Sequence, residues 1–197
     1  MQYSTVLAKY QQCQGQCSDA KKDFYTNIIS YIERNEELLK EIHQKFNNVH
    51  ISEQTNLLAQ SQKDLIVIKF SSTIEIFVKQ LLNIHFASQI DNTFIESFID
   101  DVIIDAKGRN VHIEYVEEIL KKFNSNTILK NMINPTEHSL TYAEFKTSLK
   151  SLKNNRNSVA HQGNAIVSTT IQDIEENYLK CLLFIIALDK ILDDNFI

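Results

Sequence analysis

The segment Ile66–His85, IVIKFSSTIEIFVKQLLNIH, decides the fold class of this chain of 197 residues. Its apolar residues fall on most sides of a helix, which is the pattern of an element at the centre of a helical bundle. The β-branched residues within it would also suit a strand, but a strand of this length would be an outlier. The segment is therefore predicted to form the second half of a long central helix running from about Glu53 to Phe86.

The composition favours helices along the rest of the chain as well. Only three glycines and one proline occur, whereas an all-β chain needs far more turn residues. Apolar residues make up 43% of the chain, which is enough for a sizeable core without disulfides or metals. The length suits one domain better than two. Residues 1–197 are therefore expected to form a single all-α domain, an antiparallel bundle of about five to six helices.

Hydrophobic periodicity and capping residues predict where the helices lie. Residues 1–17 are weakly patterned and suit either a short helix or a frayed N-terminal arm. The remaining helices are expected at residues 19–46, 53–86, 92–104, 113–123, 141–160 and 168–193. Connections are expected at residues 47–52, 105–112 and 124–140, the last with room for one short helical turn.

Charge and cysteine content restrict the class of protein. The formal net charge is -5, so any contact with RNA must come from a local basic patch rather than from the chain as a whole. Cys13, Cys17 and Cys181 do not form a disulfide framework, and a zinc site at the first two would need two further ligands. The longest apolar run, Cys181–Leu188, is too short to span a bilayer, and the N-terminus lacks a secretion signal. These features predict a reduced, cytoplasmic protein without membrane attachment.

The helix expected at residues 141–160 carries the chemistry. Thr141 and Glu144 fit a capping box at its start. At about 100° per residue, an apolar stripe runs along it, with Arg156 at its middle where another leucine would be expected. The stripe comprises Phe145, Leu149, Leu152 and Val159. A guanidinium directed at a core or an interface needs compensating partners or has a chemical task.

The neighbouring flank of this helix is basic. Lys146, Lys150 and Lys153 line it, and Glu144 is the only acidic residue in the stretch. This local positive charge on an acidic protein is the candidate contact surface for RNA phosphates.

His161 follows Arg156 by five residues, just before Gln162 and Gly163 end the helix. Histidine exchanges protons near neutral pH, while arginine binds phosphate oxygens through its planar fork. RNA cleavage by its own 2′-hydroxyl requires a base, a proton donor and a cation that holds the phosphorane. The residues alone leave open a plainer interpretation, namely a surface histidine and an arginine that pairs with a buried carboxylate.

Other candidate sites are weaker. His43, His85 and His112 show no metal-ligand spacing and are expected to be structural. The acidic C-terminal residues Asp189, Asp193 and Asp194 are expected to form a solvated tail. No phosphate-binding glycine loop is present, which argues against an enzyme that hydrolyses nucleotides on its own.

The motif RNSVAH (Arg156–His161), followed closely by Gly163, resembles the R-x(4–6)-H signature of the HEPN superfamily. Its usual form is Arg-Asn, a few residues and then His-Gly, whereas here Gln162 separates the histidine from the glycine. FSSTIEIFVKQL (70–81) is similar to the family's central helix, where a Glu precedes an aromatic residue and a Lys. GRNVHIEYVEEILKKF (108–123) is similar to the loop and helix of the branch called RiboL-PSP-HEPN. The resemblance spans roughly residues 53–193.

This resemblance implies an antiparallel helical bundle that forms a homodimer, with two R-x(4–6)-H motifs meeting in one composite RNase site. It implies that Arg156 stabilises the scissile phosphate, that His161 transfers a proton or binds phosphate, and that Asn157 orients both. Glu75 is a supporting candidate that either pairs with Arg156 in the site or simply neutralises it in the core. No metal or other cofactor is implied. The family contains toxins and phage-defence effectors, some paired with an antitoxin or a nucleotidyltransferase, and also members without catalysis.

Helix geometry gives a separate argument for the dimer. If the helix continues unbroken to His161, the side chains of Arg156 and His161 diverge by about 140° around its axis. A two-fold axis beside the motif would let a second copy supply the missing group. The main expectation is therefore an RNA endonuclease of toxin or phage-defence type. The alternatives are a non-catalytic interaction module for an antitoxin or nucleotidyltransferase, which binds nucleotide or RNA, and a plain structural bundle.

Overall fold

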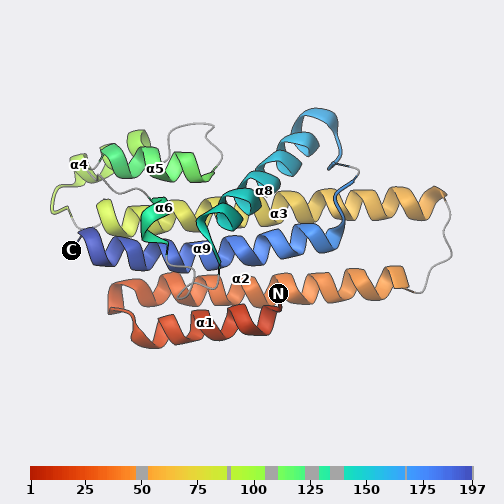
Figure 1. The fold of residues 1–197 in the computed structure, drawn as a ribbon, viewed down its shortest axis with the longest axis horizontal. Coiled ribbons are helices and arrows are strands. Elements are labelled where there is room, and N and C mark those ends of the chain that lie inside the picture. The colour runs from red at the N-terminus through yellow and green to blue at the C-terminus, as the bar shows by residue number, and fades with distance from the viewer. Residues whose placement is uncertain are drawn as a thin grey trace.

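Every regular element in the described part of the chain is a helix (Figure 1). The computed structural model describes residues 1–47, 53–87, 90–104, 111–122, 129–133, 140–166 and 168–196. In chain order the elements are α1 (Tyr3–Gln16), α2 (Asp19–Asn47), α3 (Glu53–Phe86), α4 (Thr93–Phe98), the π-helix η1 (Ile99–Ile104), α5 (Ile113–Lys122), α6 (Leu129–Met132), α8 (Tyr142–Gln162) and α9 (Ile171–Phe196). The prediction of an all-α fold is confirmed.

The long helices α2, α3 and α9 run side by side along the long axis of the molecule (Figure 1). Phe70 of α3 stacks on Tyr178 of α9, with 4.0 Å between the ring centroids. The amide of Asn35, on α2, donates a hydrogen bond of 2.7 Å to the hydroxyl of Tyr178. These contacts fix the three helices against one another at one level of the core.

Helix α3 has the predicted boundaries, but only one of its faces lies in the core. Phe70, Ile74 and Phe77 are buried there, as the apolar pattern requires. The pattern also predicted burial on most other sides, and this is wrong, because Leu65 is 54% and Ile68 is 43% exposed. The helix therefore carries an apolar surface as well as an apolar core face.

Helix α1 resolves the alternatives left open for the N-terminal residues. It is a packed helix and not a frayed arm, because Tyr3, Val6 and Tyr10 are buried. The hydroxyl of Tyr10 donates to the carbonyl oxygen of Leu182 on α9 at 2.7 Å. One cluster of buried apolar residues extends from α1 to the last turns of α9.

The helix predicted at residues 92–104 is divided into α4 and the π-helix η1. The short turn allowed in the third connection is α6. Residues 48–52, 105–110, 123–128 and 134–139, on which most of the predicted connections fall, lie outside the described residues. No helix in the described ranges is long and apolar enough to cross a membrane.

Helix α8 crosses the bundle obliquely. Its first turns lie near α5, and its last turns stand away from α3 and α9 before the chain returns to the start of α9 (Figure 1). This inclination determines which of its side chains reach the surface.

Candidate functional site

The chain that leaves α8 is held by hydrogen bonds to α3 and to α8 itself. At the C-terminus, Gly163 adopts a left-handed conformation with φ of 79°, which glycine accepts without steric cost. Asp64 of α3 accepts a hydrogen bond of 2.7 Å from the backbone N–H of Ala165. The hydroxyl of Ser158 donates to the carbonyl oxygen of Asn164 at 2.8 Å. The end of the helix is therefore tied to α3 through the residues that follow it.

The start of α8 is fixed by the predicted capping box. The hydroxyl of Thr141 accepts from the backbone N–H of Glu144, and the carboxylate of Glu144 accepts from the backbone N–H of Thr141. Both ends of the helix are thus terminated by side-chain or backbone groups that the sequence analysis identified.

Arg156, Asn157 and His161 all lie on α8, which remains helical through Gln162. His161 is exposed, while Arg156 and Asn157 are half-buried. Because the helix is unbroken between them, the side chains of Arg156 and His161 leave the axis about 140° apart. Within the described residues, the guanidinium of Arg156 makes no ion pair with a carboxylate. One chain thus presents an arginine without an ion pair to any described residue and an exposed imidazole, on different sides of the same helix.

The predicted position of Arg156 at the middle of the inward stripe is wrong. At this level of the helix the buried side chain is Asn155, which is 2% exposed, followed by Ser158 at 9%. Phe145, Leu149 and Leu152 are buried as predicted, so the inward face shifts around the helix toward its C-terminus. The oblique crossing of α8 causes this shift, because the line of contact with the bundle does not run parallel to the helix axis.

The supporting candidate Glu75 is not joined to Arg156. Its carboxylate makes an ion pair of 2.9 Å with Lys79, one turn further along α3. In the described part of the chain there is no ion pair between Glu75 and Arg156. The interpretation of Glu75 as the intrachain partner of that arginine is therefore wrong.

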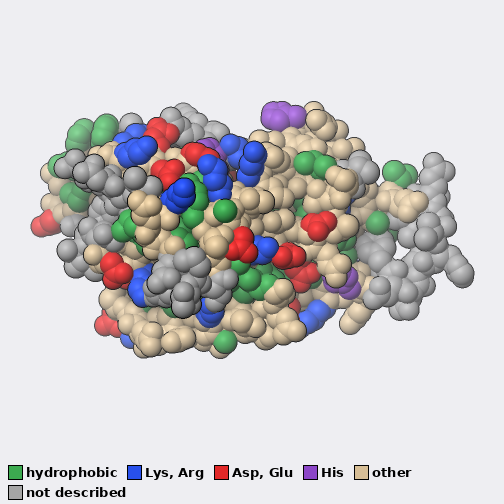
Figure 2. All heavy atoms as spheres, viewed as in Figure 1, with side chains coloured by type: hydrophobic (Ala, Val, Ile, Leu, Met, Phe, Trp, Pro, Cys, Tyr) green, Lys and Arg blue, Asp and Glu red, His purple; other side chains and the backbone are tan. Residues whose placement is uncertain are grey.

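The three predicted lysines differ in their surroundings. Lys146 makes an ion pair of 2.6 Å with Glu114 of α5, and this carboxylate raises the pKa of the lysine. Lys150 is exposed and Lys153 is half-buried, and neither forms an ion pair with a described residue. Burial and the charge of Lys153 lower the pKa of His112 at the start of α5. Figure 2 shows Lys and Arg side chains gathered over α5 and the adjoining part of α8.

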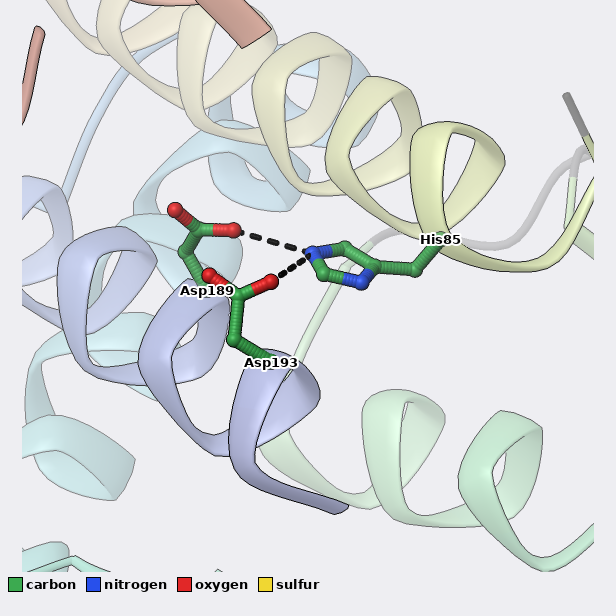
Figure 3. Close-up of side chains that lie close together, drawn as sticks. All are labelled: His85, Asp189 and Asp193. Atoms are coloured by element: carbon green, nitrogen blue, oxygen red, sulfur yellow. Dashed lines mark hydrogen bonds and ion pairs between the residues drawn. The ribbon is translucent and has the colours of Figure 1, made fainter. Parts of the chain in front are cut away.

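A second cluster of ionisable groups joins the ends of three helices, and the sequence analysis missed it. Figure 3 shows His85 of α3 directed toward Asp189 and Asp193 of α9. The Nε2 atom of His85 lies 2.9 Å from a carboxylate oxygen of Asp189. Lys21 of α2 places its ammonium 2.6 Å from both Asp189 and Asp193, and the hydroxyl of Tyr25 donates to Asp189.

Asp189 is only 5% exposed, so the prediction of a solvated acidic tail is wrong for this residue. Burial by itself raises the pKa of its carboxyl group, but hydrogen bonds from His85, Lys21 and Tyr25 outweigh it and bring the pKa below the ordinary value. The burial of Asp189 could have been predicted from its position around the helix α9. Asp189 follows Ile185 by four residues and therefore lies on the same inward face of α9.

The same cluster contains the one grouping of potential metal ligands found among the described residues. Ligand atoms of His85, Asp189 and Asp193 lie within 4.8 Å of one another. However, the ammonium of Lys21 already contacts both carboxylates at 2.6 Å. The negative charge that would attract a metal ion is thus compensated by the protein itself, and the cluster is a buried ion-pair network.

The fold and the motif together define an all-helical protein with an Arg-x4-His sequence at the end of an oblique surface helix. A family model for the RiboL-PSP-HEPN domain matches residues 10–194, and the chain belongs to this family. The predicted family is thus confirmed, and the match extends through α2 into α1, beyond the region of the original resemblance. No match was found among curated proteins or among solved structures.

Proposed function

We propose that this protein is a metal-independent RNA endonuclease, of toxin or phage-defence type, whose active site is assembled between two copies of the chain. Family membership supports the reaction class, since HEPN domains are often RNases. The observation that carries the proposal is the unbroken helix α8, which displays Arg156 without an ion-pair partner among the described residues and His161 on a different side. The divergence of about 140° between the two side chains of one chain supports a site shared between two copies.

A two-fold axis beside the end of α8 would bring Arg156 of one subunit next to His161 of the partner subunit. Such an interface uses the same surface patch from both copies, so each group is supplied twice. The hydrogen bonds at the end of α8 favour this arrangement, because catalysis requires groups that hold their positions without reorganisation.

The exposed face of α3 offers a surface on which the second copy can pack. Its apolar side chains are all at least 43% exposed and fall within about 100° of one another around the helix. They are Leu57, Leu58, Leu65, Ile68 and Ile76. This stripe adjoins α8. Asp64, next to Leu65 on α3, accepts a hydrogen bond from the backbone N–H of Ala165. Ser71, three residues after Ile68, donates one to the carbonyl oxygen of Leu152 on α8. Contiguous exposed apolar surface of this kind marks interaction sites.

The proposed reaction is the attack of an RNA 2′-hydroxyl on its own 3′-phosphate. The O2′–P bond forms and the P–O5′ bond breaks, which leaves a 2′,3′-cyclic phosphate and a 5′-hydroxyl. His161 takes part in the proton transfer from O2′ or to O5′, and Arg156 holds the negative charge of the phosphorane. Asn157, next to Arg156, would orient these groups, and Lys150 and Lys153 would bind flanking phosphates.

The direct test is incubation of the protein with total RNA in the presence of EDTA. Wild type is expected to cleave the RNA, while Arg156→Ala and His161→Ala are expected to leave it intact. Asn154→Ala, at an exposed position of the same helix, is the matched control and should cleave normally. Cleavage that is indifferent to both active-site changes, or that EDTA abolishes, would contradict the proposal.

The alternative function is a non-catalytic module that binds RNA, an antitoxin or a nucleotidyltransferase. The ion pair of Lys146 with Glu114, which reduces the free positive charge on α8, favours it. The same experiment distinguishes the two, since a module of this kind would leave RNA intact in all variants.

A further inference from the structure

Helix α4 (Thr93–Phe98) buries none of its six residues. Its three large apolar side chains, Phe94, Ile95 and Phe98, are 80%, 45% and 51% exposed. Positions i, i+1 and i+4 of a helix lie on one side, so the three side chains form a single patch. Hydrophobic side chains are visible at this edge of the molecule in Figure 2. Contiguous apolar surface that faces water is typical of a binding site for another molecule.

The backbone that carries this patch is well anchored. The side chain of Asn92 caps α4 by accepting hydrogen bonds from the N–H groups of Phe94 and Ile95, at 3.1 and 3.2 Å. At its other end α4 continues directly into η1, whose residues Ile99 and Ile104 are buried in the core. The apolar side chains are thus presented outward by a fixed element, which reduces the entropy that a partner must overcome on binding.

Negative charge accompanies the patch along the chain. Asp91, Glu96, Asp100 and Asp101 lie on or beside α4, and no basic residue occurs in the sequence from position 86 to position 106. Within the described ranges, none of these four carboxylates forms an ion pair with a basic side chain. A ligand that covers the patch therefore gains most if it brings its own positive charge.

A hollow adjoins the acidic rim of the patch at Asp100. Asp100 also lines a cavity of about 470 Å³ that lies between α2 and α3. Asp23 adds a second carboxylate to the same cavity, and Phe24 forms part of its apolar wall. Lys79 also lines the cavity, but its ammonium is paired with Glu75 at 2.9 Å. The cavity offers room for a long side chain with an apolar stem and a charged end, which describes lysine and arginine.

We propose that the α4 patch, made of Phe94, Ile95 and Phe98 with its acidic rim, binds a basic amphipathic helix of a partner protein. Apolar side chains of that helix would cover Phe94 and Phe98, and its Lys or Arg residues would face the four carboxylates. The rim repels RNA and anionic membranes. The chain's own net charge of -5 also disfavours a second copy at this place. The proposal is independent of the nuclease activity.

Figure 1 places α4 at the end of the bundle away from the last turns of α8. A partner bound at the α4 patch would therefore leave the surface around Arg156 and His161 open. Such a partner would recruit the protein to a particular place in the cell and would not block the proposed nuclease site.

The test measures binding of the full chain to a fluorescent model peptide by anisotropy. The probe is a helical peptide of about five turns, with leucines on one face and lysines on the other. A scrambled peptide of the same composition, without the apolar face, is its control. Phe94→Ser with Phe98→Ser is expected to weaken binding by about tenfold or more, as for central anchors of an interface. Asp100→Asn with Asp101→Asn is expected to weaken it most at low salt.

The control is Ile166→Ser, which removes an exposed apolar side chain (38%) that belongs neither to the α4 patch nor to the proposed dimer face. It should bind the peptide like wild type. Thermal melting of the α4 variant should match wild type, because the replaced side chains are not in the core. Equal weakening in the Ile166 control, equal binding of the scrambled peptide, or full binding by the α4 variant would overturn the proposal.

Two further measurements exclude other occupants. Sedimentation of the chain alone tests a second copy, and flotation with phosphatidylcholine vesicles tests a lipid surface. We expect the α4 variant to match wild type in both. Self-association or vesicle binding that disappears in the α4 variant would assign the patch to that occupant and overturn the protein-partner proposal.

Discussion

Mixing two inactive variants should restore RNA cleavage if the active site is shared between subunits. Arg156→Ala keeps every His161, and His161→Ala keeps every Arg156. Alone, each variant is expected to lose about 10²-fold or more of its cleavage rate, as when a proton-transfer group or a charge-stabilising donor is removed. A mixed dimer, however, contains one intact arginine and one intact histidine on opposite subunits.

The size of the recovery follows from the geometry of α8. Random pairing makes about half of the dimers mixed, and each mixed dimer retains one of the two Arg–His pairs that a two-fold axis creates. The co-refolded mixture should therefore show about a quarter of the wild-type rate. An active site within one chain would require side chains about 140° apart on one helix to converge. In that case the mixture holds no intact chain and stays inactive.

The assay is fluorescence release from a quenched RNA oligonucleotide in EDTA, after denaturation and co-refolding of equal amounts of the two variants. A mixture made without subunit exchange serves as the control and should remain inactive. The double variant Arg156→Ala with His161→Ala, co-refolded with wild type, should also leave mixed dimers without a cross-subunit pair. Active single variants, or a co-refolded mixture no faster than its parts, would refute the shared site.

Three other outcomes test the structure. Leu65→Glu with Ile68→Glu should convert the proposed dimer into an inactive monomer, as measured by sedimentation. Its melting temperature should match that of a wild-type monomer, since both side chains face water in the single chain. A dimer that persists in this variant would exclude this face. Lys150→Ala should raise the KM for RNA and reduce the salt dependence of that KM. The control Lys40→Ala, which removes the same charge from α2, should change neither. Equal effects in the two variants would indicate only a general effect of net charge. The pKa of Asp189 is lower in the folded state, so this carboxylate stabilises the fold fully above its unfolded-state pKa and loses that effect as the pH falls toward its folded-state pKa. Urea unfolding of wild type should show this loss of stability in acid. The same dependence of stability on pH in Asp189→Asn would assign the loss to other groups.

The ends of the helices were predictable from sequence because their causes are local. The capping box at Thr141 and Glu144 satisfies free N–H groups within one turn, and the glycine at position 163 accepts the left-handed conformation that ends α8. The start and end of α3 were equally accessible from the length of its apolar pattern. These signals depend on residues close together in the chain, so the helix ends can be predicted without knowing which other helices pack nearby.

The errors at the candidate site have a common origin. Periodicity gives the phase of a side chain around its own helix, but not the direction from which the neighbouring helices approach. Because α8 crosses obliquely, Asn155 and not Arg156 faces inward at the end of the contact. Glu75 was placed near Arg156 by family resemblance, whereas its ion-pair partner is Lys79 on the same helix.

The sequence by itself determined an all-helical chain, the central helix that contains IVIKFSSTIEIFVKQLLNIH and the position of the Arg-x4-His motif. Only the tertiary structure decided that this helix keeps one apolar face in water, that Asp189 is buried beside Lys21, and that α4 exposes its aromatic side chains. The physical reason is that helix formation follows local backbone and capping energetics. Burial and charge compensation instead depend on residues far apart in the chain, which come together only when the helices pack.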